Sequence, residues 1–229
     1  MVEIEEIQER NLSEQKPRVL IYGTGKHGPE AAQIANELGW HIVGAYNRAG
    51  DKVGNDVGLL NNGKAPIGVI VEDCDQVDFG QLDVDLAIVA TTDRLADNWP
   101  VHERLLSAGV NVVCHGSEGY FPFGRNPEIA EKLDAVAKKN GVTFTGTGVW
   151  DHSRIWAGIL AAGPCQTIKA LHHRSRTRID ISPYTEMVGT GLTVTEFEET
   201  IVKNPGPLGG IYSTIPNICL LYTSDAADE

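Results

Sequence analysis

Three glycines near the N-terminus have the spacing of a dinucleotide-binding turn. The segment Gly23-Thr24-Gly25-Lys26-His27-Gly28 follows an apolar run at 19–22 and opens a stretch of helical character. In this pattern the first glycine permits a tight turn, the second lets the backbone approach a pyrophosphate, and the third packs the helix against the strand. The helix N-terminus then faces the negative charge. We therefore expect residues 23–28 to hold the pyrophosphate of a nicotinamide dinucleotide.

The residues after the second expected strand bear on which dinucleotide is bound. An Asp or Glu at this place accepts a hydrogen bond from the ribose 2′-hydroxyl of NAD, but this sequence has Asn47 and Arg48. Without a carboxylate there is no repulsion of a 2′-phosphate, and a guanidinium pairs well with phosphate. The pattern predicts a preference for NADP (NADPH). Binding of NAD is the alternative if Arg48 is only a solvated surface cation.

The loop after the fifth expected strand, residues 114–122, contains a single carboxylate, Glu118, among glycine and aromatic neighbours. Burial there would bring its proton affinity into the working range of a general acid/base. We rank Glu118 first as the catalytic residue and His115 second, because an imidazole titrates near neutrality. The alternative for Glu118 is a helix cap or an exposed loop residue. Asp93 and Asp151 are expected to be caps.

Further contacts are expected from loops at the carboxyl ends of the strands, where ligands bind in open α/β sheets. The additional cofactor-binding candidates are Ala90, Thr91, Thr92, His115 and Gly148. The candidates for an aromatic substrate pocket are Tyr120, Phe121, Trp150 and Trp156, although each alone is more often a core residue. Arg and Lys are scarce around these loops, which favours simple ketones or aldehydes over keto acids. The four cysteines lack metal-ligand spacing, so no metal is expected.

Short β-branched runs alternate with helical stretches from Arg18 onward, which is typical of an α/β fold with a doubly wound parallel sheet. Strands are expected at 19–22, 42–46, 68–71, 86–90, 112–113 and 142–145. Helices are expected near 29–38, 100–107 and 127–139. These elements predict a dinucleotide-binding Rossmann domain over residues 18–150, preceded by an acidic N-terminal appendage over 1–17.

The pattern changes after residue 150. A helix near 154–161, an alternating segment at 168–176 and a helix that opens at Thr195 and ends before Pro205 predict a second, α+β domain over 151–218. The alternating segment is typical of an open antiparallel sheet with one solvated face. Residues 219–229 do not continue this pattern and are interpreted as a non-native, adapter-like tail. On that interpretation the second domain is truncated at its C-terminus.

Length and charge narrow the class of function. The chain has 229 residues, enough for one large core and part of a second domain. Its formal net charge of -12, from 31 acidic and 19 basic residues, argues against nucleic-acid and membrane-surface partners. No apolar run approaches the roughly 20 residues of a membrane-spanning helix, and the acidic N-terminus does not suit a signal peptide. We expect a cytoplasmic protein that acts on small molecules.

Several segments together resemble the native amine dehydrogenases related to 2,4-diaminopentanoate dehydrogenase, within the dihydrodipicolinate-reductase-like superfamily. These are residues 23–28, Ala90-Thr91-Thr92, the run from Asn111 to Pro122, Gly146-Thr147-Gly148 and 189–193. The resemblance covers most of residues 18–203. It implies a homodimer that uses NADPH and ammonia to aminate small ketones or aldehydes and deaminates amines in reverse. Glu118 stands at the place of the family's glutamate, whereas Ser117 stands where relatives often carry a second acid.

Two other functions remain open. Residues 172–176 resemble the His-His motif of dihydrodipicolinate reductase, an imine reductase. However, Arg176 stands at the place of that motif's lysine, and residues 181–184 depart from its Pro-Ser-Gly-Thr loop. The other alternative is an NADP-binding sensor without turnover. Oxidation of NADPH that depends on ammonia would distinguish the amine dehydrogenase from both.

Overall fold

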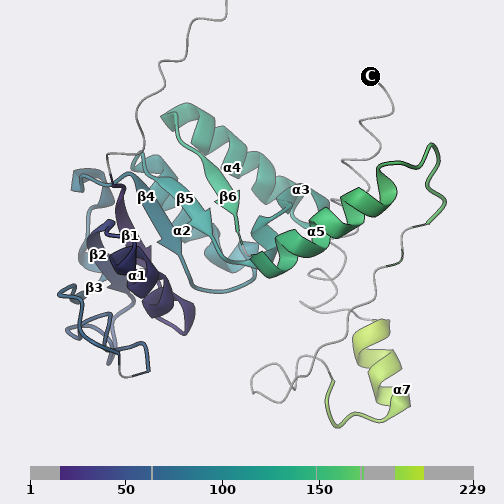
Figure 1. Cartoon of the computed structure of the whole chain (residues 1–229), viewed down its shortest axis with the longest axis horizontal. Helices are drawn as coiled ribbons and strands as arrows, with labels where there is room; N and C mark the ends of the chain where they lie inside the picture. Colours follow the sequence, from purple (N-terminus) through teal and green to yellow (C-terminus); the bar gives the residue numbers. More distant parts are fainter. Residues whose placement is uncertain (1–15, 63, 148, 171, 173–188, 204–229) are drawn as a thin grey trace, which may run out of the picture. The chain divides into compact units, whose positions relative to one another are not determined.

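The computed structural model describes residues 16–62, 64–147, 149–170, 172 and 189–203 (Figure 1). The chain divides into two compact units, which are described separately. One unit comprises residues 1–91, 101–114 and 136–144, and the other comprises 92–100, 115–135 and 145–229. The expected appendage at 1–17, apart from residues 16 and 17, and the tail at 219–229 lie outside the described residues.

Within the described part of the chain, the strands form one six-stranded sheet in the order β3-β2-β1-β4-β5-β6. The strands are β1 Arg18–Tyr22, β2 His41–Asn47, β3 Val71–Asp73, β4 Leu86–Val89, β5 Asn111–Cys114 and β6 Phe144–Gly146. The pairings of β1 with β2, β1 with β4, β2 with β3 and β4 with β5 are all parallel. The predicted doubly wound α/β fold is therefore confirmed. Its order reverses between β1 and β4, where a ligand site is expected in such folds.

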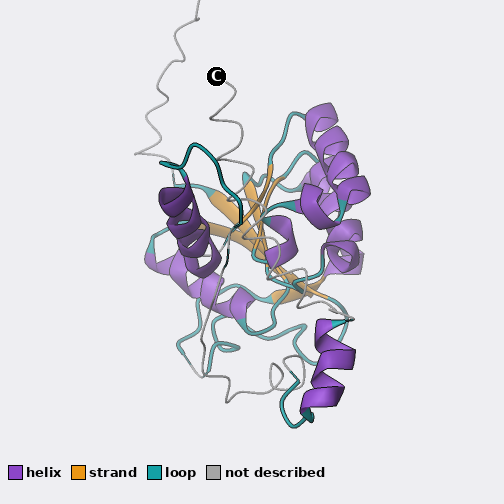
Figure 2. Cartoon of the chain, turned by 90° about the vertical axis from the view of Figure 1, so that its right-hand side faces the viewer, coloured by secondary structure: helices purple, strands orange, loops and turns teal. Residues whose placement is uncertain are grey.

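The helices follow the strands along the chain. The longer ones are α1 His27–Glu37, α2 Leu95–Ser107, α4 Pro127–Asn140 and α5 Val149–Ala162. The shorter ones are η1 Cys74–Gln76, η2 Phe79–Gln81, η3 Ser117–Gly119, α3 Pro122–Arg125, α7 Val194–Phe197 and η4 Glu198–Val202. In the first unit the strands form the central layer (Figure 2), and α1 contacts β1, β2 and β4.

The core of the first unit lies where β1 is enclosed by its neighbours. Val19, Leu20 and Ile21 have no exposed surface. Ile21 packs in a cluster with Ala32 of α1 and Ala45 of β2. A central parallel strand covered on both faces is apolar at every position, which explains why the run at 19–22 does not alternate with polar residues. Its burial fixes the place of the glycine turn that follows.

Several boundaries differ from the predicted ones because they depend on contacts distant in the sequence. The third strand begins at Val71, not at 68, since Gly68 has a φ of 82° and donates its N–H to Asp56. The helix predicted to begin at Pro100 begins at Leu95, and Pro100 lies inside it. The backbone N–H of Leu95 donates to Glu118, 23 residues away. A cap that comes from so far along the chain has no local sequence signal.

The second unit confirms two expected helices and leaves its expected sheet undecided. The helix predicted near 154–161 extends over Val149–Ala162. The helix expected to open at Thr195 begins one residue earlier, at Val194, where Thr193 and Glu196 form a capping box. Of the alternating segment at 168–176, only 168–170 and 172 are described, and these residues lie outside any strand. The rest of that segment lies outside the described residues.

Two further observations concern the described residues only. Their cysteines, Cys74, Cys114 and Cys165, form no disulfide with one another. Among their helices none is long and apolar enough to span a bilayer.

Candidate functional site

The glycine turn after β1 has the backbone geometry that the motif predicts. Gly23 has a φ of 93°, a conformation that residues with a side chain rarely adopt. Its N–H donates to the carbonyl oxygen of Tyr46 at 2.8 Å. A Cβ at Gly23 would lie 2.6 Å from the carbonyl oxygen of Ala90, and one at Gly28 would lie 1.8 Å from the carbonyl oxygen of Gly23. These two glycines are therefore required by the packing of the turn itself.

The middle of the turn has the features needed to receive a pyrophosphate. A Cβ at Gly25 would meet nothing within 4 Å, so this glycine is not required by contacts within the protein. The Lys26 side chain does not cap the N-terminus of α1. Thr24 is buried, and its hydroxyl has no hydrogen-bond partner among the described residues. An unsatisfied buried hydroxyl beside the N-terminus of a helix fits an anionic ligand, so the residues present fit the dinucleotide.

The end of β2 presents the residues expected to read the adenosine ribose. Asn47 is the last residue of β2, is half-buried and pairs in register with Asp73 of β3. Arg48 follows it with an exposed side chain. A third polar residue, Lys52, which the sequence reasoning missed, donates from Nζ to the carbonyl oxygen of Thr24 at 2.8 Å.

The loop after β4 contributes backbone and small side chains. Ala90 is buried and donates its N–H to the carbonyl oxygen of Tyr22 at 2.8 Å, while Thr91 is exposed. Gly23 thus lies against Ala90 and Thr91, two of the expected cofactor contacts. In the second unit, Thr92 accepts the N–H of Arg94 on its hydroxyl oxygen, and its carbonyl oxygen accepts from the side chain of the buried Asn98.

Glu118, the first-ranked catalytic candidate, is a buried carboxylate in η3 of the second unit with only 6% of its surface exposed. Its Oε2 accepts the backbone N–H of Leu95 at 2.9 Å and a hydrogen bond from the Asn126 side chain at 3.2 Å. Because Leu95 is the first residue of α2, Glu118 also caps that helix, where a negative charge is stabilised. A helix cap was the alternative to a catalytic role for Glu118, and this geometry allows one carboxylate to have both roles.

Asp93 also holds the loop after β5, through hydrogen bonds to the backbone of η3. Its Oδ1 accepts from the backbone N–H of Ser117 at 3.3 Å, and its carbonyl oxygen accepts the N–H of Glu118 at 3.4 Å. Asp93, two residues before α2, thus caps η3, while Glu118 of η3 caps α2. This reciprocal arrangement is consistent with the expected cap role of Asp93. It holds the Glu118 backbone in one place.

The remaining candidates of the second unit vary in their surroundings. His115, Tyr120 and Phe121 are half-buried, and the Phe121 ring lies 6.2 Å from that of the exposed Phe123. Trp156 is 61% exposed. The role of these aromatic residues in a substrate pocket stays a prediction. The described residues do not include Gly148 or the side chains of Trp150 and Asp151. Of the imine-reductase motif, His172 is described and is exposed, whereas residues 173–176 and 181–184 lie outside the described residues.

Gly146, at the end of β6, brings the strand into close contact with the Glu118 loop. A Cβ there would lie 2.5 Å from the backbone carbon of Gly119 and 2.6 Å from the backbone nitrogen of Tyr120. Any larger residue would displace this loop. The glycine of the 146–148 motif is thus explained by backbone packing beside Glu118.

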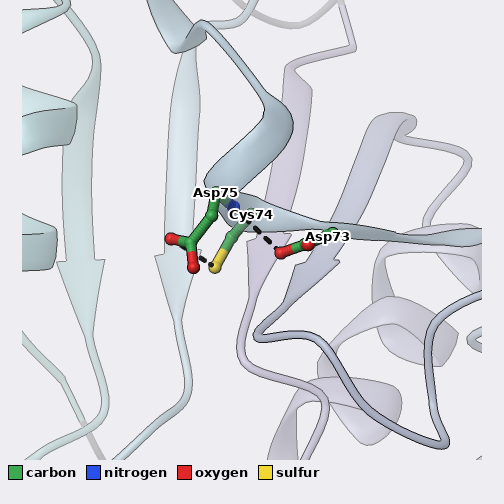
Figure 3. Close-up of side chains that lie close together, drawn as sticks. All are labelled: Asp73, Cys74 and Asp75. Carbon is green, nitrogen blue, oxygen red and sulfur yellow. Dashed lines mark hydrogen bonds between the residues drawn. The ribbon is translucent and has the colours of Figure 1, made fainter.

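A separate group of potential ligand atoms lies at the end of β3. Asp73, Cys74 and Asp75 place one ligand atom each within 4.8 Å of one another (Figure 3). The carboxylate of Asp73 caps η1 by accepting the N–H of Asp75 at 3.1 Å. Burial, followed by a hydrogen bond with Cys74, raises the pKa of Tyr22. The turn accounts for this arrangement, and we assign it no metal.

Asn98 and Asn126 are two further site residues that the sequence did not predict. Asn98 was missed because the helix was expected to begin after it, although an amide so close to a helix start is a usable signal. Asn126 lies between α3 and α4, directly before Pro127, and an Asn followed by a Pro in the first helical position is a helix-start signal. The hydrogen bond from its side chain to Glu118 depends on the tertiary structure, so the sequence does not predict this contact.

Comparison with known proteins agrees with the motifs. No family model matches the sequence. The chain is 28% identical over 207 residues to the 2,4-diaminopentanoate dehydrogenase of Acetoanaerobium sticklandii, covering 86% of this chain and 56% of that protein. The solved structure of an amine dehydrogenase from Mycobacterium smegmatis matches with a TM-score of 0.66 and 29% identity, covering 88% of this chain and 61% of that one.

The chain thus spans 56% and 61% of the lengths of these two relatives. The similarity extends over both compact units, since it covers well over four-fifths of the chain. The chain is therefore homologous to the amine dehydrogenases, as the resemblance of its motifs predicts, and it shares their α/β fold.

Proposed function

We propose that the protein catalyses the NADPH-dependent reductive amination of small ketones or aldehydes with ammonia, and the reverse oxidative deamination. The observation that carries the proposal is Glu118, a buried carboxylate held by two donors in the loop after β5. The names of the relatives support amine oxidation and reduction as the reaction class.

Glu118 performs the proton transfers in this proposal. Oε2 accepts hydrogen bonds from Leu95 and Asn126, and we assign proton transfer to the Glu118 carboxyl group. The carboxylate takes a proton from ammonium, which leaves ammonia to attack the carbonyl carbon. A proton then moves from the added ammonium group to the alkoxide oxygen, which gives the neutral carbinolamine. The same carboxyl then returns the proton to the carbinolamine hydroxyl, which leaves as water. The resulting carboxylate stabilises the substrate iminium.

The dinucleotide and its turn provide the remaining function. When bound, NADPH supplies the hydride that reduces the iminium carbon. In our proposal residues 23–28 hold the pyrophosphate, and Arg48 pairs with the 2′-phosphate. The exposed guanidinium of Arg48 and the absence of a carboxylate at 47 support the preference for NADP over NAD.

Glu118→Gln tests the assignment of Glu118. The amide oxygen can still accept the N–H of Leu95, so we expect the unfolding temperature and NADPH affinity to stay close to those of the wild type. The rate of amination should fall by about 10²-fold or more, since an amide cannot exchange the proton. Glu103→Gln, an exposed substitution on α2, is the matched control and should keep full activity. A Glu118→Gln rate near that of the wild type would exclude this mechanism.

An assay of NADPH oxidation tests the function itself. We expect oxidation with small ketones such as cyclohexanone only when ammonia is present. Oxidation without ammonia would identify a carbonyl reductase. Turnover of tetrahydrodipicolinate would favour the imine reductase. NADPH binding without oxidation across the panel would favour a sensor.

A further inference from the structure

The side chain of Lys52 reaches from the segment after β2 to the glycine turn. Its ammonium group donates to the carbonyl oxygen of Thr24 at 2.8 Å, and the residue is half-buried. The two residues are 28 positions apart in the chain. This contact connects the part of the fold expected to read the ribose with the part expected to hold the pyrophosphate.

The backbone around Lys52 is anchored rather than loose. Gly54 donates its N–H to the carbonyl oxygen of Val71, and Val71 donates to that of Asn55, both at 2.8 Å. Val57, a few residues on, is fully buried in the core cluster. The segment that carries Lys52 is thus tied to β3 and the core. Its ammonium group is held near the turn by the fold.

The position of the Lys52 ammonium group beside the glycine turn favours binding of an anion. A carbonyl oxygen at the turn would repel a phosphate, and an ammonium beside it offsets that repulsion. A lysine ammonium has three N–H donors, and the contact with Thr24 uses one of them. The exposed guanidinium of Arg48 lies on the same segment, four residues earlier. The segment that follows β2 thus carries two cationic side chains, one exposed and one held at the turn.

We propose that Lys52, together with Arg48, binds the 2′-phosphate of the NADP adenosine and determines the preference for NADP over NAD. The inference rests on the proposed use of NADP. The pyrophosphate has its own place at Gly25 and the N-terminus of α1, where a Cβ would meet nothing. Lys52 instead comes from the chain that continues beyond Asn47, where the ribose is read in this fold. The 2′-phosphate is therefore the favoured ligand.

Direct binding to the 229-residue chain tests the proposal without any turnover. The variant is Lys52→Met, which keeps an unbranched apolar stem and removes the charge, and the control is Lys64→Met at an exposed lysine. Dissociation constants are measured for NADP⁺, NAD⁺, adenosine 2′,5′-bisphosphate and AMP. We expect Lys52→Met to weaken binding of the two 2′-phosphorylated ligands about tenfold or more. Binding of NAD⁺ and AMP should change less than twofold.

The possible outcomes distinguish failure of the Lys52 assignment from failure of the proposed NADP preference. Equal weakening of NADP⁺ and NAD⁺ would place Lys52 at the pyrophosphate or in support of the turn, and would overturn the proposal. Unchanged binding of all four ligands would also overturn it. If the wild type itself does not prefer adenosine 2′,5′-bisphosphate over AMP, the proposed NADP preference is wrong as well.

A second variant covers loss of folding in Lys52→Met. Lys52→Arg keeps the positive charge, and we expect it to retain the preference for 2′-phosphorylated ligands. A Lys52→Arg protein that unfolds at the wild-type temperature but binds NADP⁺ and NAD⁺ equally would contradict the role of the charge.

Discussion

Single side chains in this protein hold together segments that are far apart in the sequence. Glu118 caps α2, Asp93 caps η3, and Lys52 reaches the Thr24 carbonyl oxygen. Asp56 is a further case, because it organises the segment between β2 and β3 that also carries Lys52. Its carboxylate accepts the backbone N–H groups of Gly58, Ile67 and Gly68 at 2.7 to 3.1 Å.

The pKa of Asp56 shows which of two opposing effects is larger. Burial raises this pKa, but hydrogen bonds from Ile67, Gly58, Gly68 and Leu59 outweigh burial, so it lies below the ordinary value of 3.8. A depressed pKa means that the folded state binds the proton less readily than the unfolded state. The stability from Asp56 is therefore present above the unfolded pKa and lost as pH falls through the folded one.

Asp56→Asn should lower the free energy of unfolding at pH 7 by about 1 to 3 kcal/mol, because its NH₂ group would face backbone donors. Urea unfolding of the wild type and the variant measures this difference, and Asp51→Asn at an exposed position is the control. The difference should shrink in acid, where the wild-type carboxylate is protonated. A loss equal to that of the control would show that the three backbone bonds contribute nothing.

At the scale of elements, the unit of β1, the glycine turn, α1 and β2 separates two roles of glycine. Gly28 allows α1 to approach the turn, since a Cβ would lie 1.8 Å from the carbonyl oxygen of Gly23. Gly25 has open space around it among the described residues, so packing does not require a glycine at this position. Sequence spacing treats the two glycines alike. The structure shows that packing requires glycine at 28 but not at 25.

A pair of alanine substitutions checks this distinction. Gly28→Ala should destabilise the protein and lower its yield, because the clash is with backbone that cannot move freely. Gly25→Ala should leave the unfolding temperature nearly unchanged, yet weaken NADPH binding by about tenfold or more, since its methyl group would occupy the expected pyrophosphate position. Thermal unfolding and nucleotide titration measure the two effects. Unimpaired NADPH binding by Gly25→Ala would contradict the pyrophosphate assignment.

At the scale of the whole molecule, a buried histidine connects stability to pH. His102 of α2 has no exposed surface, neither ring nitrogen has a hydrogen-bond partner among the described residues, and its ring packs edge-on against Phe144 at 4.9 Å. Burial lowers its pKa from 6.5 to about 4. The unfolded state therefore binds the proton more readily, and stability falls as pH drops from about 6.5 toward about 4.

His102→Leu should flatten this dependence. Between pH 7 and pH 5.5, the His102 contribution to the wild-type free energy of unfolding should fall by about 1 kcal/mol, and this loss should be absent in the variant. The variant should also be more stable at pH 7, because two unpaired buried nitrogens are removed. Urea unfolding at both pH values measures the effect, with the exposed His41→Gln as control. Equal pH dependence in wild type and His102→Leu would exclude this origin.

The elements differ in how well their sequence predicts them. β1, α1 and β2 are predicted within about two residues, because apolar periodicity and glycine spacing are local properties. The start of α2 is wrong by five positions, from Pro100 to Leu95, because its cap comes from Glu118. Lys52 carries no signal, because a lone lysine in a loop matches no pattern, and the Asn126-Pro127 pair indicates only the start of a helix, not the contact with Glu118. The catalytic role of Glu118 stays a prediction.

The sequence by itself determined the parallel sheet and the glycine turn. Burial on both faces requires continuous apolar strands, and a backbone at positive φ requires glycine, so both features are recorded locally in residue types. Only the tertiary structure decided what surrounds Glu118 and where Lys52 reaches. Their partners are 23 and 28 positions away in the chain, and such contacts exist only once the strands have paired and the loops have been brought together.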